Sequence, residues 1–237
     1  MRRKTRLVIA DSHKLVAEAC KHLLQPEFDV VGIATDGRAL VQMALDLKPD
    51  GVVLEVFMSL LNGLDAAERI KRKLPSLKLM FLTATLDVDA VAEAFRRGAS
   101  GYVLKFSGAE ELVTAIRTVM RGQSYLSSLI ARETIEYLLR YPKEEGARER
   151  TTPRQTEILQ LLIEGKSMKE VARILGLTPG TVAFHKYNMM ERLGIVTNAE
   201  LLQYGLKNHM APLRESSANP VMMTPEVTDA VMQLKTA

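Results

Sequence analysis

Five polar residues in the N-terminal half stand at the ends of short apolar stretches of the chain. They are Asp11, Ser12, Glu55, Thr83 and Lys105. If those stretches are parallel strands of one sheet, their carboxyl ends meet at one edge, where such folds place their functional groups. Two carboxylates, two hydroxyls and one ammonium group would then lie close enough to form ion pairs and hydrogen bonds. We therefore expect a polar site at that edge.

The elements that would position this site alternate along residues 6–126. The predicted strands are Leu7–Ala10, Val30–Ala34, Gly51–Phe57, Leu79–Thr83 and Gly101–Leu104. The predicted helices lie near residues 14–25, 37–47, 64–73, 88–97 and 110–121, where apolar residues recur at helical spacing. Strands without polar alternation are buried on both faces, and right-handed crossovers then give a doubly wound fold. The sequence thus predicts an α/β domain with a parallel five-stranded sheet.

Residues 5–126 resemble a response-regulator receiver domain, which has a flavodoxin-like fold. The resemblance rests on Val8-Ile9-Ala10-Asp11-Ser12-His13, Val53-Leu54-Glu55-Val56, Phe81-Leu82-Thr83-Ala84 and Gly101-Tyr102-Val103-Leu104-Lys105. In that family an acidic pair holds Mg²⁺ while an aspartate accepts a phosphoryl group. The resemblance implies that Thr83 and Lys105 would grip phosphoryl oxygens. It also implies that Tyr102 forms a switch with Thr83, the alternative being a half-buried aromatic at a strand end.

The receiver-like half departs from that family at its chemical centre. Glu55 stands at the phospho-acceptor position, and Ser12 replaces one of the two metal-binding carboxylates. Asp11 alone would make a weak or absent Mg²⁺ site, because that ion demands a near-octahedral set of oxygen ligands. No resident cofactor is expected, and Mg²⁺ is the one candidate.

Three interpretations of Glu55 stay open. A Glu55–Lys105 ion pair would approximate the phosphorylated state. Alternatively, the pocket has lost its function and the domain is a dimerisation scaffold. Phosphorylation of Glu55 itself is the third interpretation.

Composition limits the class of protein. The chain has 237 residues, a net charge of +4 and a pI near 9.1, which suits about two domains and is compatible with nucleic-acid binding. Cys20 is the only cysteine, so no disulfide can form within the chain, as in a reducing cytosol. The apolar run after the basic N-terminus is too short for a signal peptide, and no run is long enough to cross a membrane. We expect a cytoplasmic protein without a membrane partner.

Residues 151–210 carry the start and stop signals of four short helices. The starts are Thr152-Pro153-Arg154-Gln155, Ser167-Met168-Lys169-Glu170, Thr178-Pro179 and Thr197-Asn198-Ala199-Glu200. The first three helices would stop at Gly165, Gly176 and Gly194. The second and third helices, joined by a three-residue turn, have helix-turn-helix spacing. The sequence therefore predicts a small all-α helix-turn-helix domain behind the α/β domain.

This second domain resembles the LuxR-type domain of NarL/FixJ-like regulators. The matching residues are Thr152-Pro153-Arg154, Gly165-Lys166-Ser167, Lys169-Glu170-Val171-Ala172, Leu177-Thr178, Thr181-Val182, His185 and Leu193-Gly194. The resemblance implies double-stranded DNA as the partner, with the third helix in the major groove. The implied DNA contacts are Lys169, Thr178, Thr181, Ala183, Phe184, Lys186 and Tyr187, with Lys186 directed outward to a phosphate. The implied homodimer contacts on the fourth helix are Ala199, Leu201, Leu202 and Tyr204.

The third helix departs from the family pattern as well. Ala183 stands where the family often has a basic residue, Tyr187 where it has a polar or basic one, and Phe184 is unusually large. We expect fewer polar base contacts and more apolar ones. The alternative is that Phe184 and Tyr187 pack under the preceding helix, and His185 is expected to pack and hydrogen-bond within the domain.

The chain is predicted to have four parts. They are a receiver-like domain at 1–126, a linker helix and flexible linker at 127–150, the helix-turn-helix domain at 151–210 and a mobile tail at 211–237. The expected function is that of a DNA-binding, phosphorylation-independent transcription regulator of the two-component response-regulator type. The alternative is a protein-interaction module whose receiver sequesters a partner regulator or sensor kinase, with weak DNA binding. Neither function is enzymatic.

Overall fold

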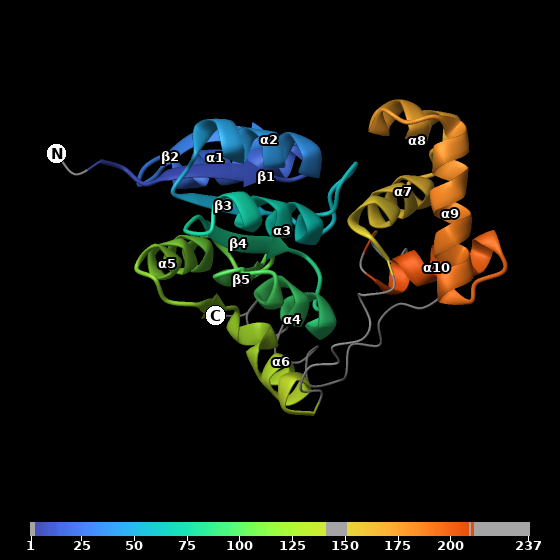
Figure 1. The fold of residues 1–237 in the computed structure, drawn as a ribbon. Helices are drawn as coiled ribbons and strands as arrows, with labels where there is room; N and C mark the ends of the chain where they lie inside the picture. The colour runs from blue at the N-terminus through green and yellow to red at the C-terminus, as the bar shows by residue number, and fades with distance from the viewer. Residues whose placement is uncertain (1–2, 141–150, 209, 211–237) are drawn as a thin grey trace.

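The computed structural model describes residues 3–140, 151–208 and 210. The predicted flexible linker after residue 140 and the predicted mobile tail at 211–237 lie outside the described residues. The described chain forms an α/β domain followed by a helical domain (Figure 1).

The first domain is built on a parallel sheet with the strand order β2-β1-β3-β4-β5-β6. The strands are β1 (Arg6–Ala10), β2 (Asp29–Ala34), β3 (Gly51–Leu54), β4 (Lys78–Thr83), β5 (Gly101–Leu104) and β6 (Tyr125–Leu126). The doubly wound parallel fold is confirmed, but the sheet has a sixth strand that the sequence analysis missed. A strand of two residues is too short to show a pattern. The third strand also ends three residues earlier than predicted, because the chain turns away at Glu55.

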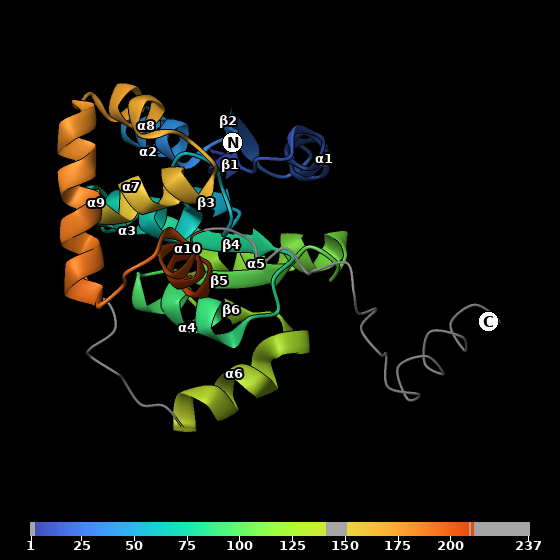
Figure 2. The same cartoon turned by 90° about the vertical axis from the view of Figure 1, so that its right-hand side faces the viewer.

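Helices cover both faces of the sheet (Figure 2). They are α1 (Lys14–Leu24), α2 (Gly37–Leu47), α3 (Gly63–Lys73), α4 (Val88–Arg96) and α5 (Ala109–Met120). Leu24 of α1 and Ile116 of α5 pack with Ile9 on one face, whereas helices α2, α3 and α4 pack on the other. Successive strand residues therefore face two different apolar cores, which explains why the strand sequences show no polar alternation.

The helix α6 (Ser128–Arg140) follows the sheet and packs against α4. Its inner side contributes Ile130 to the core of the first domain, and the hydroxyl of Thr134 donates a hydrogen bond to the Ile130 carbonyl.

The second domain contains α7 (Pro153–Ile163), α8 (Met168–Leu175), α9 (Pro179–Leu193) and α10 (Asn198–Lys207). The four predicted helix starts are confirmed: capping boxes are present at Thr152, Ser167 and Thr197, and Thr178 accepts a hydrogen bond from the Thr181 amide at the start of α9. Two small apolar clusters hold these helices together, one around Ile158 and Val182 and one around Leu159 and Met189. Within the described residues, no helix is both long and apolar enough to cross a membrane.

Gly194 ends α9 in a left-handed conformation, with φ at 66°. A Cβ at this position would meet no atom within 4 Å, so the backbone conformation alone would oppose a side chain. We expect Gly194→Ala to lower the free energy of unfolding by about 1 kcal/mol. Gly180, which lies in the helical first turn of α9, is the matched control. Gly180→Ala should not lower stability in denaturant unfolding of the full chain, and equal losses in both variants would contradict this assignment.

Candidate functional site

Three charged side chains meet at the carboxyl edge of the sheet. The Nζ atom of Lys105 lies 2.5 Å from an oxygen of Asp11 and 2.7 Å from an oxygen of Glu55. The strand register accounts for this meeting, because Ala10 pairs with Leu54 and the two acidic residues follow at the same level. The predicted Glu55–Lys105 ion pair is confirmed.

Glu55 uses both of its oxygens, although only 6% of the residue is exposed. One oxygen pairs with Lys105, and the other accepts hydrogen bonds from the backbone amides of Val56 at 2.6 Å and Phe57 at 3.4 Å. The carboxylate therefore ties the start of the following loop to the ammonium group. We call residues 56–62 the acceptor loop.

Both carboxylate oxygens of Asp11 also have partners, and the first of them pairs with Lys105. Its second oxygen accepts a hydrogen bond from the His13 amide at 2.8 Å and lies 3.2 Å from the His13 ring nitrogen Nδ1. Ser12 is exposed, and its hydroxyl accepts a weak hydrogen bond from the Ser59 amide at 3.4 Å. Serine thus supports the acceptor loop at the position where the family has a carboxylate.

The family's Mg²⁺ site is a poor match to this set of groups. Asp11 and Glu55 share one ammonium group, and the third residue offers a neutral hydroxyl. A divalent ion would have to displace Lys105 from both carboxylates and would still lack a second aspartate. The donor chemistry of these residues does not fit the ion.

The electrostatics of the site favour the ion pair. Burial by itself would lower the pKa of Lys105, but the neighbouring Glu55 and Asp11 carboxylates outweigh burial and hold that pKa above its ordinary value. The lysine is therefore a stable cation at neutral pH.

Thr83 and Tyr102 lie beside this site. Thr83 is buried, and its hydroxyl accepts a hydrogen bond from the Thr85 amide. Tyr102 is fully buried rather than half-buried, and its hydroxyl donates to the Thr85 carbonyl at 3.2 Å. Burial, with the Glu55 and Asp87 carboxylates, raises the pKa of Tyr102, so the phenol is a neutral donor. Both residues of the expected switch thus contact the same backbone turn.

In the second domain, α9 exposes two aromatic residues. Phe184 is 63% exposed and Tyr187 is 60% exposed, so the alternative that they pack under the preceding helix is wrong. His185 is half-buried, with its ring at the edge of Phe184. Thr181 and Ala183 are half-buried, and Lys169 and Thr178 are exposed. The Thr178 hydroxyl already serves as the helix cap.

The outward orientation predicted for Lys186 is wrong. This residue is only 6% exposed, because it stands four residues after Val182 and three before Met189, on the face that packs into the domain. Its ammonium group lies 5.4 Å from the centre of the Tyr187 ring. A cation over an aromatic face offsets part of the cost of this burial.

The predicted dimer contacts on α10 have different environments. Ala199 and Leu202 are exposed, but Leu201 is only 2% exposed and packs with Leu159 and Met189 in the core of its own domain. Leu201 is therefore a core residue, and its predicted role as a surface contact of the dimer is wrong. Tyr204 is half-buried and lines a cavity between the two domains.

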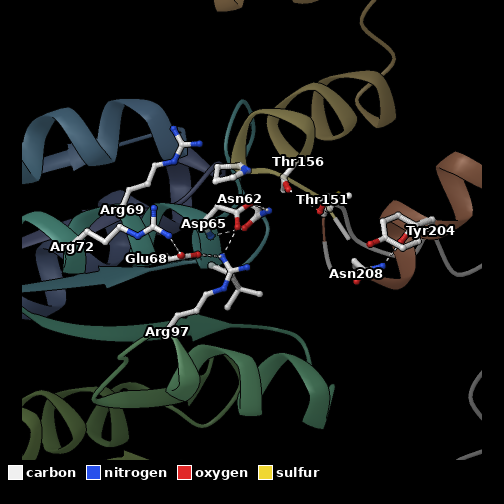
Figure 3. A pocket seen from close by; sticks show the side chains of 13 residues that line it. Asn62, Asp65, Glu68, Arg69, Arg72, Arg97, Thr151, Thr156, Tyr204 and Asn208 are labelled. Carbon is white, nitrogen blue, oxygen red and sulfur yellow. Dashed lines mark hydrogen bonds and ion pairs between the residues drawn. The ribbon is translucent and has the colours of Figure 1, made fainter. Parts of the chain in front are cut away.

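This cavity of about 270 Å³ lies between α3 on one side and α7 and α10 on the other (Figure 3). On the receiver side Arg97 pairs with Asp65 and Glu68, and Arg72 also pairs with Glu68. Tyr204 and Asn208 come from α10 on the opposite side. The guanidinium groups of Arg72 and Arg97 are thus neutralised within the receiver domain, whereas that of Arg69 pairs with Glu157 of α7.

Three polar residues, two on α7 and one at its C-cap, contact the first domain, and nothing in the sequence indicates these contacts. Glu157, Gln160 and Glu164 are spaced by three and four residues, so they share one helical face. Polar residues at that spacing normally indicate a solvated face. Sequence alone could not distinguish this interdomain contact from exposure to water.

Comparison with known proteins agrees with both domains. A model of the response regulator receiver domain matches residues 7–117, and a model of bacterial regulatory proteins of the luxR family matches residues 150–204. The transcriptional regulatory protein MctR of Rhizobium johnstonii is 33% identical over 207 residues, which cover 86% of this chain and 94% of MctR. The chain belongs to the LuxR family of two-component response regulators.

Other relatives and solved structures agree with this membership. The regulator LiaR of Bacillus subtilis is 32% identical over 86% of this chain and 98% of its own. A LuxR-family response regulator from Aurantimonas, 29% identical, covers 58% of this chain and 99% of that chain with a TM-score of 0.55. RcsB of Salmonella typhimurium, 24% identical, covers 86% and 98% with a TM-score of 0.53 and shows the fold alone. Family membership confirms the resemblance of both halves and makes this chain a DNA-binding response regulator.

Lys105 is central to the receiver of this LuxR-family regulator. Removing its charge leaves two carboxylates buried side by side, so we expect Lys105→Met to lower the free energy of unfolding by about 3 kcal/mol. Lys14 is exposed at the start of α1, and Lys14→Met should change stability by less than about 0.5 kcal/mol. Denaturant unfolding of the full chain measures both values. Similar small changes in the two variants would show that the shared ammonium group does not stabilise the site.

Proposed function

We propose that this LuxR-family regulator controls transcription as a DNA-bound homodimer and does so without phosphorylation of its receiver domain. The observation that carries the proposal is the position of Lys105 Nζ between Asp11 and Glu55. A transferred phosphoryl group would need that ammonium group for charge neutralisation. In this chain the side chain of Glu55 already binds it.

The remaining groups at the site support the same conclusion. Glu55 would act as a nucleophile only after losing its hydrogen bonds to the acceptor loop and its ion pair. Its reaction would also lack a well-formed divalent cation site, since Ser12 has no carboxylate. The receiver therefore has neither a resident cofactor nor an enzymatic role in this proposal.

The exposed face of α9 supports sequence reading through apolar contacts. Phe184 and Tyr187 are three residues apart and share that face. Apolar side chains in the major groove contact the methyl group of thymine. Lys169, exposed in the first turn of α8, can reach a phosphate.

Because the partner is DNA, the proposed location is the cytoplasm.

A homodimer is proposed from a related assembly and from α10. A solved structure of RcsB contains two RcsB dimers bound to two parallel DNAs. In this chain, Ala199 and Leu202 are exposed on α10 and available for pairing. Two copies related by a two-fold axis would read a symmetric DNA site.

The burial of Lys186 favours a second candidate function, because it removes one phosphate contact from the reading helix. In that case DNA binding is weak and the receiver binds a sensor kinase or another regulator. The two functions differ in the salt dependence and sequence preference of DNA binding.

Selection from a random pool of duplex DNA tests the proposed function. The unmodified full-length protein, made without a phosphodonor, is expected to enrich a two-fold symmetric site. The fragment 146–237 serves as the comparison. If neither protein enriches any sequence, the proposed function is wrong and the interaction module takes its place.

Two lysines of the second domain, Lys169 and Lys186, give a matched pair for the DNA contact. We expect Lys169→Ala to reduce the slope of log K against log salt by about 1, because one phosphate contact is lost. Lys186→Met should leave that slope unchanged, since the buried ammonium group releases no counterion on binding. Titrations of the selected duplex at several salt concentrations measure both slopes. A reduced slope for Lys186→Met alone would contradict this assignment.

A further inference from the structure

The part of α9 from Pro179 to Glu191 exposes aromatic side chains and no lysine or arginine. Phe184 and Tyr187 are both more than half exposed and lie one turn apart. Lys186 is the only lysine or arginine in this stretch, and it is buried. Recognition of guanine by two hydrogen bonds needs one of these cations in the major groove. The stretch therefore presents apolar surface where a cation would read guanine.

Small residues adjoin Phe184 on α9. Gly180 lies one turn before it, and a Cβ at Gly180 would meet only the Thr178 hydroxyl oxygen, at 3.8 Å. Ala183, which is half-buried, directly precedes it. Neither position has a side chain long enough to cover the aromatic ring. The Phe184 ring therefore projects from the helix surface without cover from these two neighbours.

Both exposed rings are oriented by neighbouring side chains that are more buried. The His185 ring meets Phe184 at its edge, with the ring centres 5.9 Å apart and an angle of 69° between the planes. The ammonium group of Lys186 lies 5.4 Å from the centre of the Tyr187 ring. A side chain that is already oriented loses less conformational entropy when it binds. Thus α9 offers two preorganised apolar contacts.

The major groove of DNA offers one kind of methyl group, that on C5 of thymine. Cytosine lacks this methyl group and presents a polar amino group beside the guanine oxygen and nitrogen of the opposite base. A phenyl ring against the methyl group buries apolar surface on both sides. Against an unmethylated C·G pair, the same ring would cover polar groups without giving them hydrogen bonds. Phe184 therefore distinguishes pyrimidines by their C5 substituent.

Polar side chains near Phe184 do not replace this contact. The Thr181 hydroxyl lies 2.9 Å from that of Thr178, within the helix cap. Glu191 is exposed in the C-terminal half of α9, whereas a recognition helix contacts base edges with its N-terminal residues. Asn188 follows Phe184 by one turn and is half-buried, and its amide suits adenine, the partner of thymine. Recognition of a methyl group thus rests on Phe184.

We propose that α9 recognises the C5-methyl group of pyrimidines through Phe184, beside the ring of Tyr187. Because the recognised feature is the methyl group itself, 5-methylcytosine substitutes for thymine, whereas uracil and unmethylated cytosine are disfavoured. A site with cytosine at this position therefore binds the regulator more tightly once that cytosine is methylated at C5. This inference rests on the proposed function, because it names the base feature that the DNA-bound regulator reads.

Replacement of thymine by uracil in the selected duplex removes the methyl groups and keeps the hydrogen-bonding groups of the bases. We expect the unmodified full-length protein to bind the uracil duplex about fifteenfold more weakly, since each buried methyl group contributes about fourfold and a two-fold site presents two. Replacement of one thymine at a time locates the contacted positions. Equal affinity for the thymine and uracil duplexes would overturn the inference.

Variants of the protein distinguish contact with the methyl group from an effect of uracil on DNA shape. In Phe184→Ala we expect the two duplexes to bind within about twofold of each other, because the apolar partner is lost. Phe106→Ala is the matched control, since Phe106 is an exposed phenylalanine of the receiver domain, and this variant should keep the full difference. An undiminished difference in Phe184→Ala would overturn the assignment to Phe184. An unchanged salt slope of binding shows that this variant is folded and still contacts phosphates.

DNA that contains 5-methylcytosine gives the converse test. The contacted T·A pair of each half-site is changed to C·G, and the cytosine is either methylated at C5 or left unmethylated. We expect the methylated duplex to bind about fifteenfold more tightly than the unmethylated one. Equal binding of these two duplexes would overturn recognition of the methyl group.

The same titrations separate this inference from the proposed function. A selected symmetric site whose affinity is independent of C5-methyl groups would overturn methyl recognition and leave the proposed function standing. Failure of the full-length protein to bind any selected duplex would overturn both.

Discussion

One ammonium group, that of Lys105, holds the carboxyl edge of the receiver sheet together. It lies within 2.7 Å of carboxylate oxygens from two different strand ends, those of Asp11 and Glu55. Without it, two nearly buried negative charges would face each other in a region of low dielectric constant. Because Glu55 is one methylene longer than the family's aspartate, its carboxylate reaches both this ammonium group and the amides of the acceptor loop. The same interaction therefore neutralises the site and sets the shape of the loop.

The acceptor loop, whose amides bind Glu55, also contacts the second domain. The loop binds Gln160 of α7 and Glu164 at its C-cap, and α7 packs against α8 and α9, the two helices of the helix-turn-helix. The domain interface combines hydrogen bonds and ion pairs with the packing of Leu60 against the apolar cluster of the second domain. The Nε atom of Arg38 is buried without a partner among the described residues. Such polar contacts fix the relative orientation of the domains but add little free energy to their association. When the domains come together, each polar group exchanges a hydrogen bond to water for one to the other domain. A polar interface of this kind is typical of domains whose relative arrangement can change.

The fold could be predicted from the sequence because its local signals agree with one another. Apolar strands without alternation indicate a buried parallel sheet, and the helix-start signals at Thr152, Ser167, Thr178 and Thr197 locate the helices of the second domain. Convergence of Asp11, Glu55 and Lys105 followed from the order of strand ends. The errors concern environments that depend on neighbours. The expected outward position of Lys186 is wrong, because its spacing from Val182 and Met189 places it inward. The dimer contact implied for Leu201 is wrong, because that residue packs in the core of its own domain. The contact between α7 and the receiver could not be predicted from the sequence. A row of polar residues on a helix has the same spacing whether the row faces water or a polar surface of another domain.

The measurement that tests the central claim most directly is the intact mass of the purified, unmodified regulator after incubation with a small-molecule phosphodonor and Mg²⁺. The double variant Ser12→Asp, Glu55→Asp, which restores both missing aspartates, is the positive control for the reaction. The account predicts that the unmodified chain keeps its mass while the double variant gains one phosphoryl group. A one-phosphate adduct on the unmodified chain, located at Glu55, would contradict it, because the carboxylate bound to Lys105 would then still be a nucleophile.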